Sequence, residues 1–176
     1  MGMAVKYQVP PGFRIVSGGQ SGADEAALDW AIARGVPHGG WCPKGRRAEH
    51  GVIDPRYLLT ETPRAVYRER TEWNVRDSDA TVIFSLAENL VGGSKLTASF
   101  ATRYAKPCLH ILPRLDPSVL ARFLELNHVV TLNLAGPRAS QAPGIGELVV
   151  RVLDHALEVP ASRTRGGRAA RRSSAQ

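Results

Sequence analysis

Short apolar segments alternate with amphipathic segments along most of the chain. Five apolar, β-branched runs have the length of buried strands: 13–17, 36–39, 81–85, 108–112 and 129–134. Apolar residues recur at helical spacing after each of them and predict helices over 23–34, 63–77, 96–105, the segment that follows Asp116-Pro117, and 145–158. Alternation of this kind is typical of a parallel sheet with helices on both faces.

We therefore predict an α/β protein with a three-layer, Rossmann-like fold and a five-stranded, mainly parallel sheet. If the strand at 81–85 pairs with the strand at 13–17, the strand order is 2-1-3-4-5. We expect an N-terminal extension over 1–12, one ligand-binding domain over 13–158 and an Arg-rich tail over 159–176. Ligands of such open sheets bind beyond the carboxyl ends of the strands.

Composition supports a single globular domain. The chain has 176 residues, of which 43% are hydrophobic and 22% charged. It contains neither an 18-residue apolar run nor an apolar segment at its start, so we expect a cytoplasmic protein that binds no membrane. Two cysteines, Cys42 and Cys108, are too few for a disulfide framework or a four-cysteine zinc site, and we expect both to be reduced.

The net charge of +7 comes mainly from the C-terminal segment. Residues 160–176 carry five arginines and no acidic residue, which leaves a charge of +2 on the rest of the chain. A segment rich in Ala, Ser, Gly and Arg has little to bury, so we expect it to be disordered. Such a tail could attract nucleic acid weakly, but the nearly neutral body does not indicate a nucleic-acid-binding protein.

The strand at 13–17 runs into a glycine-rich turn that opens directly into a helix. Glycines let the backbone approach a phosphate, the helix start presents free N–H groups, and Ser21 and Asp24 have the spacing of a capping box. The turn contributes the candidate anion-binding residues Gly18, Gly19, Gln20, Ser21 and Gly22. An ordinary strand-to-helix turn has the same pattern, so this motif alone does not decide the function.

A second turn of this kind follows the strand at 81–85. Its candidate residues are Gly92, Gly93 and Ser94, with Thr97 one turn into the next helix. Cations of the other loops could complete a shared pocket: Lys44, Arg46, Arg47, Lys95 and Arg138. Each of these five could equally be an ordinary surface charge. Two anion loops together favour a phosphorylated ligand.

The polar segment 70–79 offers one helical face formed by Arg70, Asn74 and Asp77. This face either lines a pocket, with Trp73 as a stacking plane, or forms a buried structural network around a core tryptophan. Cys42 is either a soft metal ligand or a filler of the pocket wall. The five histidines lack metal-ligand spacing, and Ser21 has no evident base, so we assign no catalytic residue and no metal site.

Five blocks of the sequence resemble the molybdenum cofactor carrier proteins. They are 17–24 (SGGQSGAD), 39–46 (GGWCPKGR), 70–79 (RTEWNVRDSD), 92–97 (GGSKLT) and 132–138 (LNLAGPR), and they span nearly all of 13–158. The resemblance implies a Rossmann-like fold related to the LOG and DprA group and a homodimer or a dimer of dimers. It also implies that the protein binds and protects the molybdenum cofactor, molybdopterin phosphate with its metal, and hands it to molybdoenzymes.

A nucleotide-binding hydrolase or sensor of the LOG-like group, acting on nucleoside monophosphates, is the alternative. LOG-type hydrolases have the loop Pro-Gly-Gly-x-Gly-Thr followed by a catalytic glutamate. Here the loop is Val91-Gly92-Gly93-Ser94-Lys95-Leu96-Thr97, and residues 98–100 contain no acid, although Asp77 or Asp79 could supply a carboxylate. A carrier is therefore favoured over an enzyme, with Lys44, Arg46, Arg70, Asn74, Asp77 and Arg138 joining the glycine loops as cofactor-binding candidates.

Overall fold

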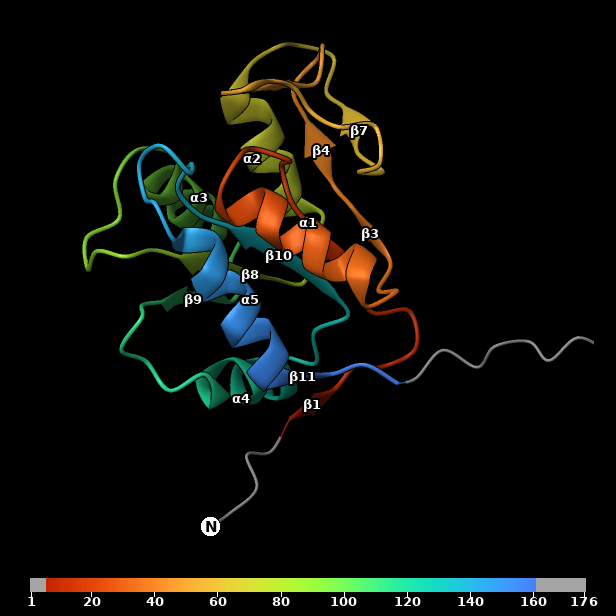
Figure 1. Cartoon of the computed structure of the whole chain (residues 1–176), viewed down its shortest axis with the longest axis vertical. Helices are drawn as coiled ribbons and strands as arrows, with labels where there is room; N and C mark the ends of the chain where they lie inside the picture. The colour runs from red at the N-terminus through yellow and green to blue at the C-terminus, as the bar shows by residue number, and fades with distance from the viewer. Residues whose placement is uncertain (1–5, 161–176) are drawn as a thin grey trace, which may run out of the picture.

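A five-stranded sheet forms the centre of the molecule (Figure 1). The computed structural model describes residues 6–160. The strands lie in the order β3 (His38–Gly39), β2 (Arg14–Val16), β10 (Thr131–Ala135), β8 (Ala80–Phe84) and β9 (Cys108–Ile111). All four neighbouring pairs are parallel. The α/β, Rossmann-like fold class predicted from the alternating pattern is confirmed.

The predicted strand order is wrong at one position. The last predicted strand, β10, does not lie at the edge beyond β9 but between β2 and β8. Leu132 of β10 is in register with Ile15 on one side and with Ala80 on the other. The two glycine-rich loops are therefore separated by the loop that follows β10, although parallel pairing keeps all three at the carboxyl edge of the sheet.

Three helices cover one face of the sheet. Helix α1 (Ala23–Ala33) packs against α5 (Ile145–Ala156), and α5 also packs against α4 (Ser118–Leu126). Alternate residues of β8, including Val82 and Phe84, join the core on this side. Figure 1 views the molecule from this face. The end of α1 agrees with the sequence pattern, since Gly35 follows the helix with a φ of 64°.

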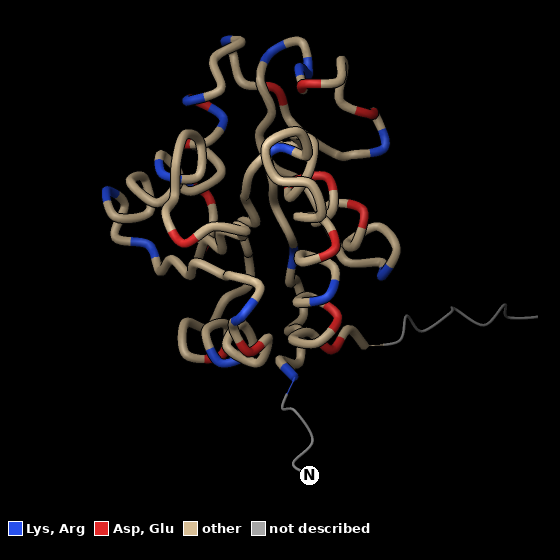
Figure 2. Tube along the Cα trace, turned by 60° about the vertical axis from the view of Figure 1, so that its left-hand side comes forward, with Lys and Arg blue, Asp and Glu red and all other residues tan. Residues whose placement is uncertain are grey.

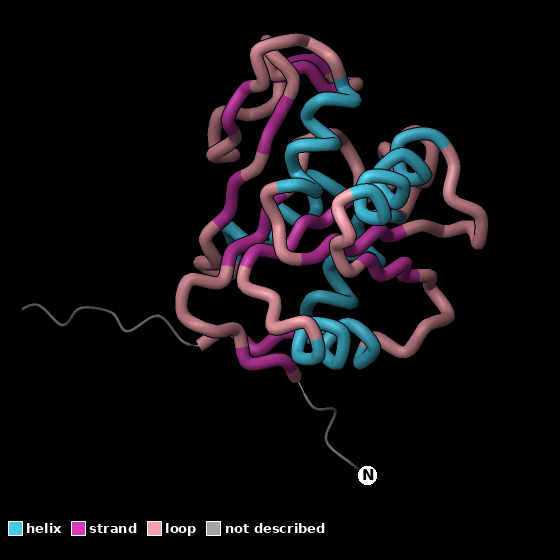
Figure 3. Tube along the Cα trace, turned by 180° about the vertical axis from the view of Figure 1, so that it is seen from behind, coloured by secondary structure: helices cyan, strands magenta, loops and turns pink. Residues whose placement is uncertain are grey.

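Helices α2 (Tyr67–Arg76) and α3 (Gly92–Arg103) pack together against the opposite face, toward the viewer of Figure 3. Their contact buries Val75, Phe100 and Ala101. Helix α3 begins four residues before the predicted start because its glycine-rich loop forms the first helical turn. Helix α2 begins four residues after the predicted start, because Val66 before it is extended.

Three small strand pairs were not predicted. β1 (Tyr7–Gln8) pairs in parallel with β11 (Leu157–Glu158), and two pairs fold the segment between α1 and α2. These two are β4 (Trp41–Cys42) with β7 (Thr60–Glu61) and β5 (Arg47–Ala48) with β6 (Gly51–Val52). Two-residue strands leave too short a pattern to recognise from sequence. The predicted disordered tail lies outside the described residues from residue 161 onward.

The helices described for residues 6–160 are all shorter or more polar than a membrane-crossing helix needs to be.

Positively and negatively charged residues are mixed along the described chain. Figure 2 shows Lys and Arg positions interspersed with Asp and Glu over the described chain. Positive charge therefore has to be sought in particular sites and not on one whole face.

Candidate functional site

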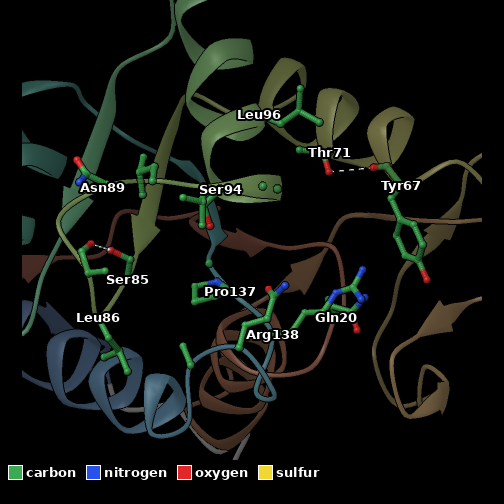
Figure 4. Close-up of a pocket in the computed structure, with 18 of the residues that line it drawn as sticks. Gln20, Tyr67, Thr71, Ser85, Leu86, Asn89, Ser94, Leu96, Pro137 and Arg138 are labelled. Atoms are coloured by element: carbon green, nitrogen blue, oxygen red, sulfur yellow. Dashed lines mark hydrogen bonds between the residues drawn. The ribbon is translucent and has the colours of Figure 1, made fainter.

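A pocket of about 720 Å³ lies at the carboxyl edge of the sheet (Figure 4). Its walls come from the three loops that follow β2, β8 and β10 and from the first turns of α2 and α3. One part of the wall is apolar, with Leu86, Leu90, Val91, Leu96 and Ala142. A cavity with an apolar wall and a few polar groups is the usual form of a small-molecule site.

The amino end of α3 opens into this pocket. Val91 precedes the helix in an extended conformation, and no described side chain caps the helix start. Gly92, Gly93 and Ser94 line the pocket, and a Cβ atom at Gly93 would meet no heavy atom within 4 Å. Free amide groups and open space at a helix start are the elements of an anion site.

The first glycine-rich loop is used mainly for packing. At Gly22, φ is 83°, and a Cβ atom there would lie 2.6 Å from the carbonyl oxygen of Pro137. The Ala23 amide donates to that same oxygen at 3.3 Å, so the start of α1 is covered by the loop after β10. Ser21 is covered as well, because its hydroxyl donates to Glu49 and accepts from the Ala139 amide. Of the predicted residues in this loop, only Gln20 lines the pocket.

Arg70 reaches the pocket through a buried ion pair. Its Nη1 lies 3.2 Å from Oδ2 of Asp24, and its side chain is 15% exposed. Gly18 makes room for it, because a Cβ atom there would lie 1.8 Å from Arg70 Nη1. Burial raises the pKa of Asp24, while the charge of Arg70 and the hydrogen bond from the backbone N–H of Gln20 oppose this rise.

Two further arginines line the pocket beside aromatic rings. The guanidinium of Arg138 lies 5.5 Å from the centre of the Tyr67 ring, and that of Arg68 lies 5.0 Å from the Phe100 ring. Figure 4 shows Arg138, Pro137 and Gln20 on the side of the opening that faces Thr71 and Tyr67. With Arg70, three arginines line the pocket, whereas the described lining residues include no Asp or Glu. The site is therefore suited to an anion.

From the sequence, the polar face of α2 was expected either to line a pocket or to form a structural network, and its residues do both. Arg70 lines the pocket, whereas Asn74 and Asp77 form a structural network around Trp41. Asn74 accepts from the Trp41 amide at 2.8 Å and donates to its carbonyl at 2.9 Å, and Asp77 accepts from the indole Nε1 at 2.8 Å. The ring of Trp41 meets that of Trp73 edge to face at 4.7 Å. These contacts attach α2 to β4.

Arg46 folds back onto its own loop. Its guanidinium donates to four carbonyl oxygens, those of Ile53, Asp54, Tyr57 and Leu59, at 2.9 to 3.3 Å. This arrangement organises the segment between β4 and β7 and leaves few donors for a ligand. Lys44 is exposed, and neither residue lines the pocket.

The structure thus brings together six of the residues predicted for the cofactor: Gln20, Arg70, Gly92, Gly93, Ser94 and Arg138. It places nine others away from the pocket lining: Gly18, Gly19, Ser21, Gly22, Lys44, Arg46, Asn74, Asp77 and Thr97. Thr97 is buried and donates to the Gly93 carbonyl at 2.9 Å, so it supports the first turn of α3.

Sequence reasoning missed Tyr67, Arg68 and the apolar segment 86–91. Tyr67 and Arg68 were missed because the predicted helix over 63–77 extended four residues too far at its start and concealed the first turn of α2. The segment 86–91 was interpreted only as a short loop before the glycines. It also missed Ser85, whose Oγ lies 2.7 Å from Nε2 of His110 beside the pocket. Burial lowers the pKa of His110, which favours the neutral imidazole.

The donor set of residues 6–160 does not suggest a metal centre. These residues contain no group of three or more His, Cys, Asp or Glu side chains placed to hold an ion. Cys42 is fully buried against Leu28, Ile53 and Tyr57, and burial raises the pKa of its thiol. It fills a wall of a small core beside the main sheet.

The described residues form a Rossmann-like protein whose pocket is lined by three arginines. The comparisons agree with the fold class. Residues 15–157 match the model of the circularly permutated YpsA SLOG family. The crystal structure of a protein from Syntrophus aciditrophicus SB, named a "putative molybdenum carrier protein", is similar to this chain with a TM-score of 0.81 and 45% identity. The match covers 89% of this chain and 100% of that one. A search of curated proteins found no match.

The family match spans well over half of the chain, so the protein belongs to the circularly permutated YpsA SLOG family. The resemblance to the molybdenum carrier proteins found in the five sequence blocks is confirmed by the similar structure from Syntrophus aciditrophicus.

Proposed function

We propose that the protein binds and protects the molybdenum cofactor in the pocket at the carboxyl edge of the sheet. The observation that carries the proposal is the combination of three arginines, an uncapped helix start and an apolar wall around about 720 Å³. A pterin with a terminal phosphate needs both an apolar surface for its rings and donors for its charge. The name of the similar Syntrophus protein supports the same ligand class.

The proposed contacts follow the lining of the pocket. The amides of Gly92, Gly93 and Ser94, together with Arg68 and Arg138, neutralise the phosphate, and Leu86, Leu90 and Val91 lie against the rings. The predicted residues outside the lining act indirectly. Gly18 makes space for Arg70, Gly22 lets two loops pack together, and Asn74 and Asp77 attach α2 to β4.

The pocket lining favours a carrier over a nucleotide hydrolase. No described lining residue has a carboxylate. Of the two carboxylates that could replace the missing glutamate, Asp77 accepts from Trp41 and Arg76, and Asp79 accepts from the amides of Val130 and Thr131. Both are engaged in the fold outside the lining, so the described lining lacks a carboxylate for general acid–base catalysis on a nucleotide.

Titration with cofactor released from a molybdoenzyme tests the proposal. We expect a saturable complex whose cofactor survives longer in air than free cofactor and still reconstitutes an apo-molybdoenzyme. The Gly93→Asp variant is the matched negative control and should bind the cofactor less tightly, because it adds a carboxylate in open space at the start of α3. Absence of retention and of protection by the wild-type protein would disprove the function. Release of free base from nucleoside monophosphates would favour the hydrolase instead.

The second part of the proposal is transfer of the bound cofactor to an acceptor enzyme. We propose that molybdoenzymes in the cytoplasm are the acceptors and that the protein acts as a homodimer or a dimer of dimers. Incubation of loaded protein with an apo-molybdoenzyme across a dialysis membrane separates direct delivery from release. Direct delivery requires contact, so activity should recover more slowly with the membrane in place. Light scattering of the purified protein measures the assembly.

A further inference from the structure

Gln20 has a buried side-chain nitrogen that finds no acceptor among residues 6–160. The residue is 4% exposed, and its Nε2 makes no hydrogen bond within the described chain. A buried amide nitrogen without a partner is unfavourable and rare in native proteins. Gln20 lines the pocket, so a small shift of its side chain on ligand binding would bring Nε2 to an acceptor of the ligand.

The orientation of the Gln20 amide is fixed by its other end. Its Oε1 accepts from the Ser21 amide at 3.1 Å and from the Glu49 amide at 2.7 Å. A flipped amide would turn Nε2 toward two N–H donors and leave both without an acceptor. Gln20 therefore offers its ligand a donor and not an acceptor.

Arg70 places a second free donor next to Gln20. Its Nε is buried and has no partner among the described residues, although Nη1 pairs with Asp24. Oδ2 of Asp24 also accepts from the backbone N–H of Gln20 at 3.3 Å, so one carboxylate oxygen joins the two residues. We call this part of the pocket the Gln20–Arg70 corner. It combines two unpaired donors on one side of a single cavity.

The corner differs in charge from the rest of the pocket. The charge of Arg70 is balanced by Asp24 at 3.2 Å, whereas Arg68 and Arg138 face aromatic rings. A phosphate with up to two negative charges is better stabilised by Arg68, Arg138 and the uncapped start of α3. The corner is better suited to a group that accepts hydrogen bonds without adding a full charge.

We propose that the Gln20–Arg70 corner binds the metal–oxo end of the cofactor, while the phosphate lies at the start of α3. The inference rests on the proposed function and adds the orientation of the ligand. Oxo groups only accept hydrogen bonds, in agreement with a corner that only donates them. A pterin ring has an amide and an amino group and would need acceptors as well. The Gln20–Arg70 corner therefore distinguishes the molybdenum-loaded cofactor from metal-free molybdopterin.

The Gln20→Glu variant tests this orientation. Glutamate keeps the size of the side chain and an oxygen for the Ser21 and Glu49 amides, but it replaces the free donor with a charged acceptor. Gln141→Glu is the matched control, because Gln141 is an exposed residue that lines the same pocket. Affinities are measured anaerobically for the molybdenum-loaded cofactor and for metal-free molybdopterin, with circular dichroism to verify folding.

We expect Gln20→Glu to weaken binding of the loaded cofactor by about tenfold or more. The same variant should change the affinity for metal-free molybdopterin by less than about threefold. Gln141→Glu adds a charge to the pocket without removing the Gln20 donor, so it should change the affinities for both forms by the same factor. Arg70→Lys gives an independent measurement if Gln20→Glu does not fold. Lysine keeps a charge for Asp24 but removes the Nε donor, so it should also weaken the loaded form selectively.

An equal loss of affinity for both forms would overturn the orientation, since the corner would then hold a part that they share. A loss in Gln141→Glu that is as selective for the loaded form would overturn it too, because charge alone would then explain the result. In both cases the wild-type protein still binds cofactor, and the proposed function stands. If the wild-type protein binds neither form, the proposed function itself fails, and the orientation fails with it.

Discussion

Arg70 of α2 and Asp24 of α1 form an ion pair at the rim of the pocket, with 3.2 Å between Nη1 and Oδ2. Both are largely buried, at 15% and 3% side-chain exposure. The guanidinium lies over the backbone of Gly18, which has no side chain to obstruct it. Residues separated by 46 positions along the chain thus form one unit that fixes a pocket cation.

Replacing Gly18 with alanine should displace this cation. The new Cβ atom would lie 1.8 Å from Arg70 Nη1, and moving the guanidinium leaves buried Asp24 without its counter-charge. We expect the free energy of unfolding to fall by about 1 to 3 kcal/mol, measured by urea denaturation. Gly93→Ala is the control, because its Cβ atom meets nothing within 4 Å, and its stability should be unchanged or higher. Equal stability of Gly18→Ala and wild type would contradict the packing argument.

Replacing Gly93 with aspartate should weaken ligand binding without harming the fold. The carboxylate would occupy open space beside the phosphate position at the start of α3. Repulsion between two anions at about 4 Å costs roughly 1 to 4 kcal/mol near a protein surface, so affinity should fall at least several-fold. Equilibrium dialysis with released cofactor gives the affinity, and the thermal midpoint verifies the fold. Retained affinity would move the phosphate elsewhere.

Arg46 should contribute to stability more than to binding. Lysine cannot reproduce the four donor contacts to the carbonyls of Ile53, Asp54, Tyr57 and Leu59. We expect Arg46→Lys to lower the free energy of unfolding by about 1 to 3 kcal/mol and to speed proteolysis between β4 and β7. Lys44→Ala, at an exposed position in the same loop, should leave both unchanged. A variant that loses affinity but keeps its stability would restore Arg46 as a ligand contact.

The two cysteines should differ strongly in reactivity. Cys108 is exposed at the edge strand β9, whereas Cys42 is fully buried. Partial desolvation raises the pKa of both thiols, so access of the reagent decides the difference. A thiol reagent such as dithionitrobenzoate should therefore modify one cysteine in the native protein and both after denaturation. Cys108→Ser should abolish the native reaction. Rapid native labelling of that variant would show that Cys42 is reachable through the loop around it.

Acid should weaken the attachment of α2 to β4. Hydrogen bonds from Arg76 and from the indole of Trp41 lower the pKa of Asp77. The ionised carboxylate thus stabilises the fold above its ordinary pKa of about 3.9, and this contribution is lost as the pH falls through the lower, folded value. Asp77→Asn should lose less stability than wild type between about pH 5 and pH 3. The difference in the free energy of unfolding between the two proteins should change by less than about 1 kcal/mol over this pH range, because Asp77 is partly exposed. If the two free energies fall in parallel with pH, the prediction is wrong.

The sequence pattern was sufficient for the fold class but not for the position of β10. Strand order depends on where the α4 crossover returns the chain, and the spacing of apolar residues in 118–126 does not encode that direction. The pattern also found the glycine-rich loop at Gly92–Ser94, because a glycine loop between a strand and a helix is a local signal, but it placed the helix start four residues too late. It could not separate Gln20, whose neighbours orient a free donor, from Ser21, whose hydroxyl is occupied by Glu49.

Arg46 and Arg138 illustrate the same limit. Both are arginines in glycine-containing loops at the edge of a sheet, and residue type alone predicts phosphate contacts for each. In the folded chain one binds backbone carbonyls and the other lies over Tyr67 beside the pocket. The distinction depends on which carbonyls the loop leaves unpaired, and this is decided only when the segment 43–62 has folded.

The pairing of β1 with β11 lies at the opposite edge of the sheet from the pocket. The Tyr7 hydroxyl donates to the carbonyl of Val129, just before β10 begins, and Figure 1 shows both short strands beside α4 at the lower end of the molecule. Fastening the protein to a sensor chip through either of these strands' outer ends would thus leave the mouth of the cavity facing the flowing solution. Loading and discharge could then be timed on the same immobilised molecules, with the acceptor enzyme supplied in the stream.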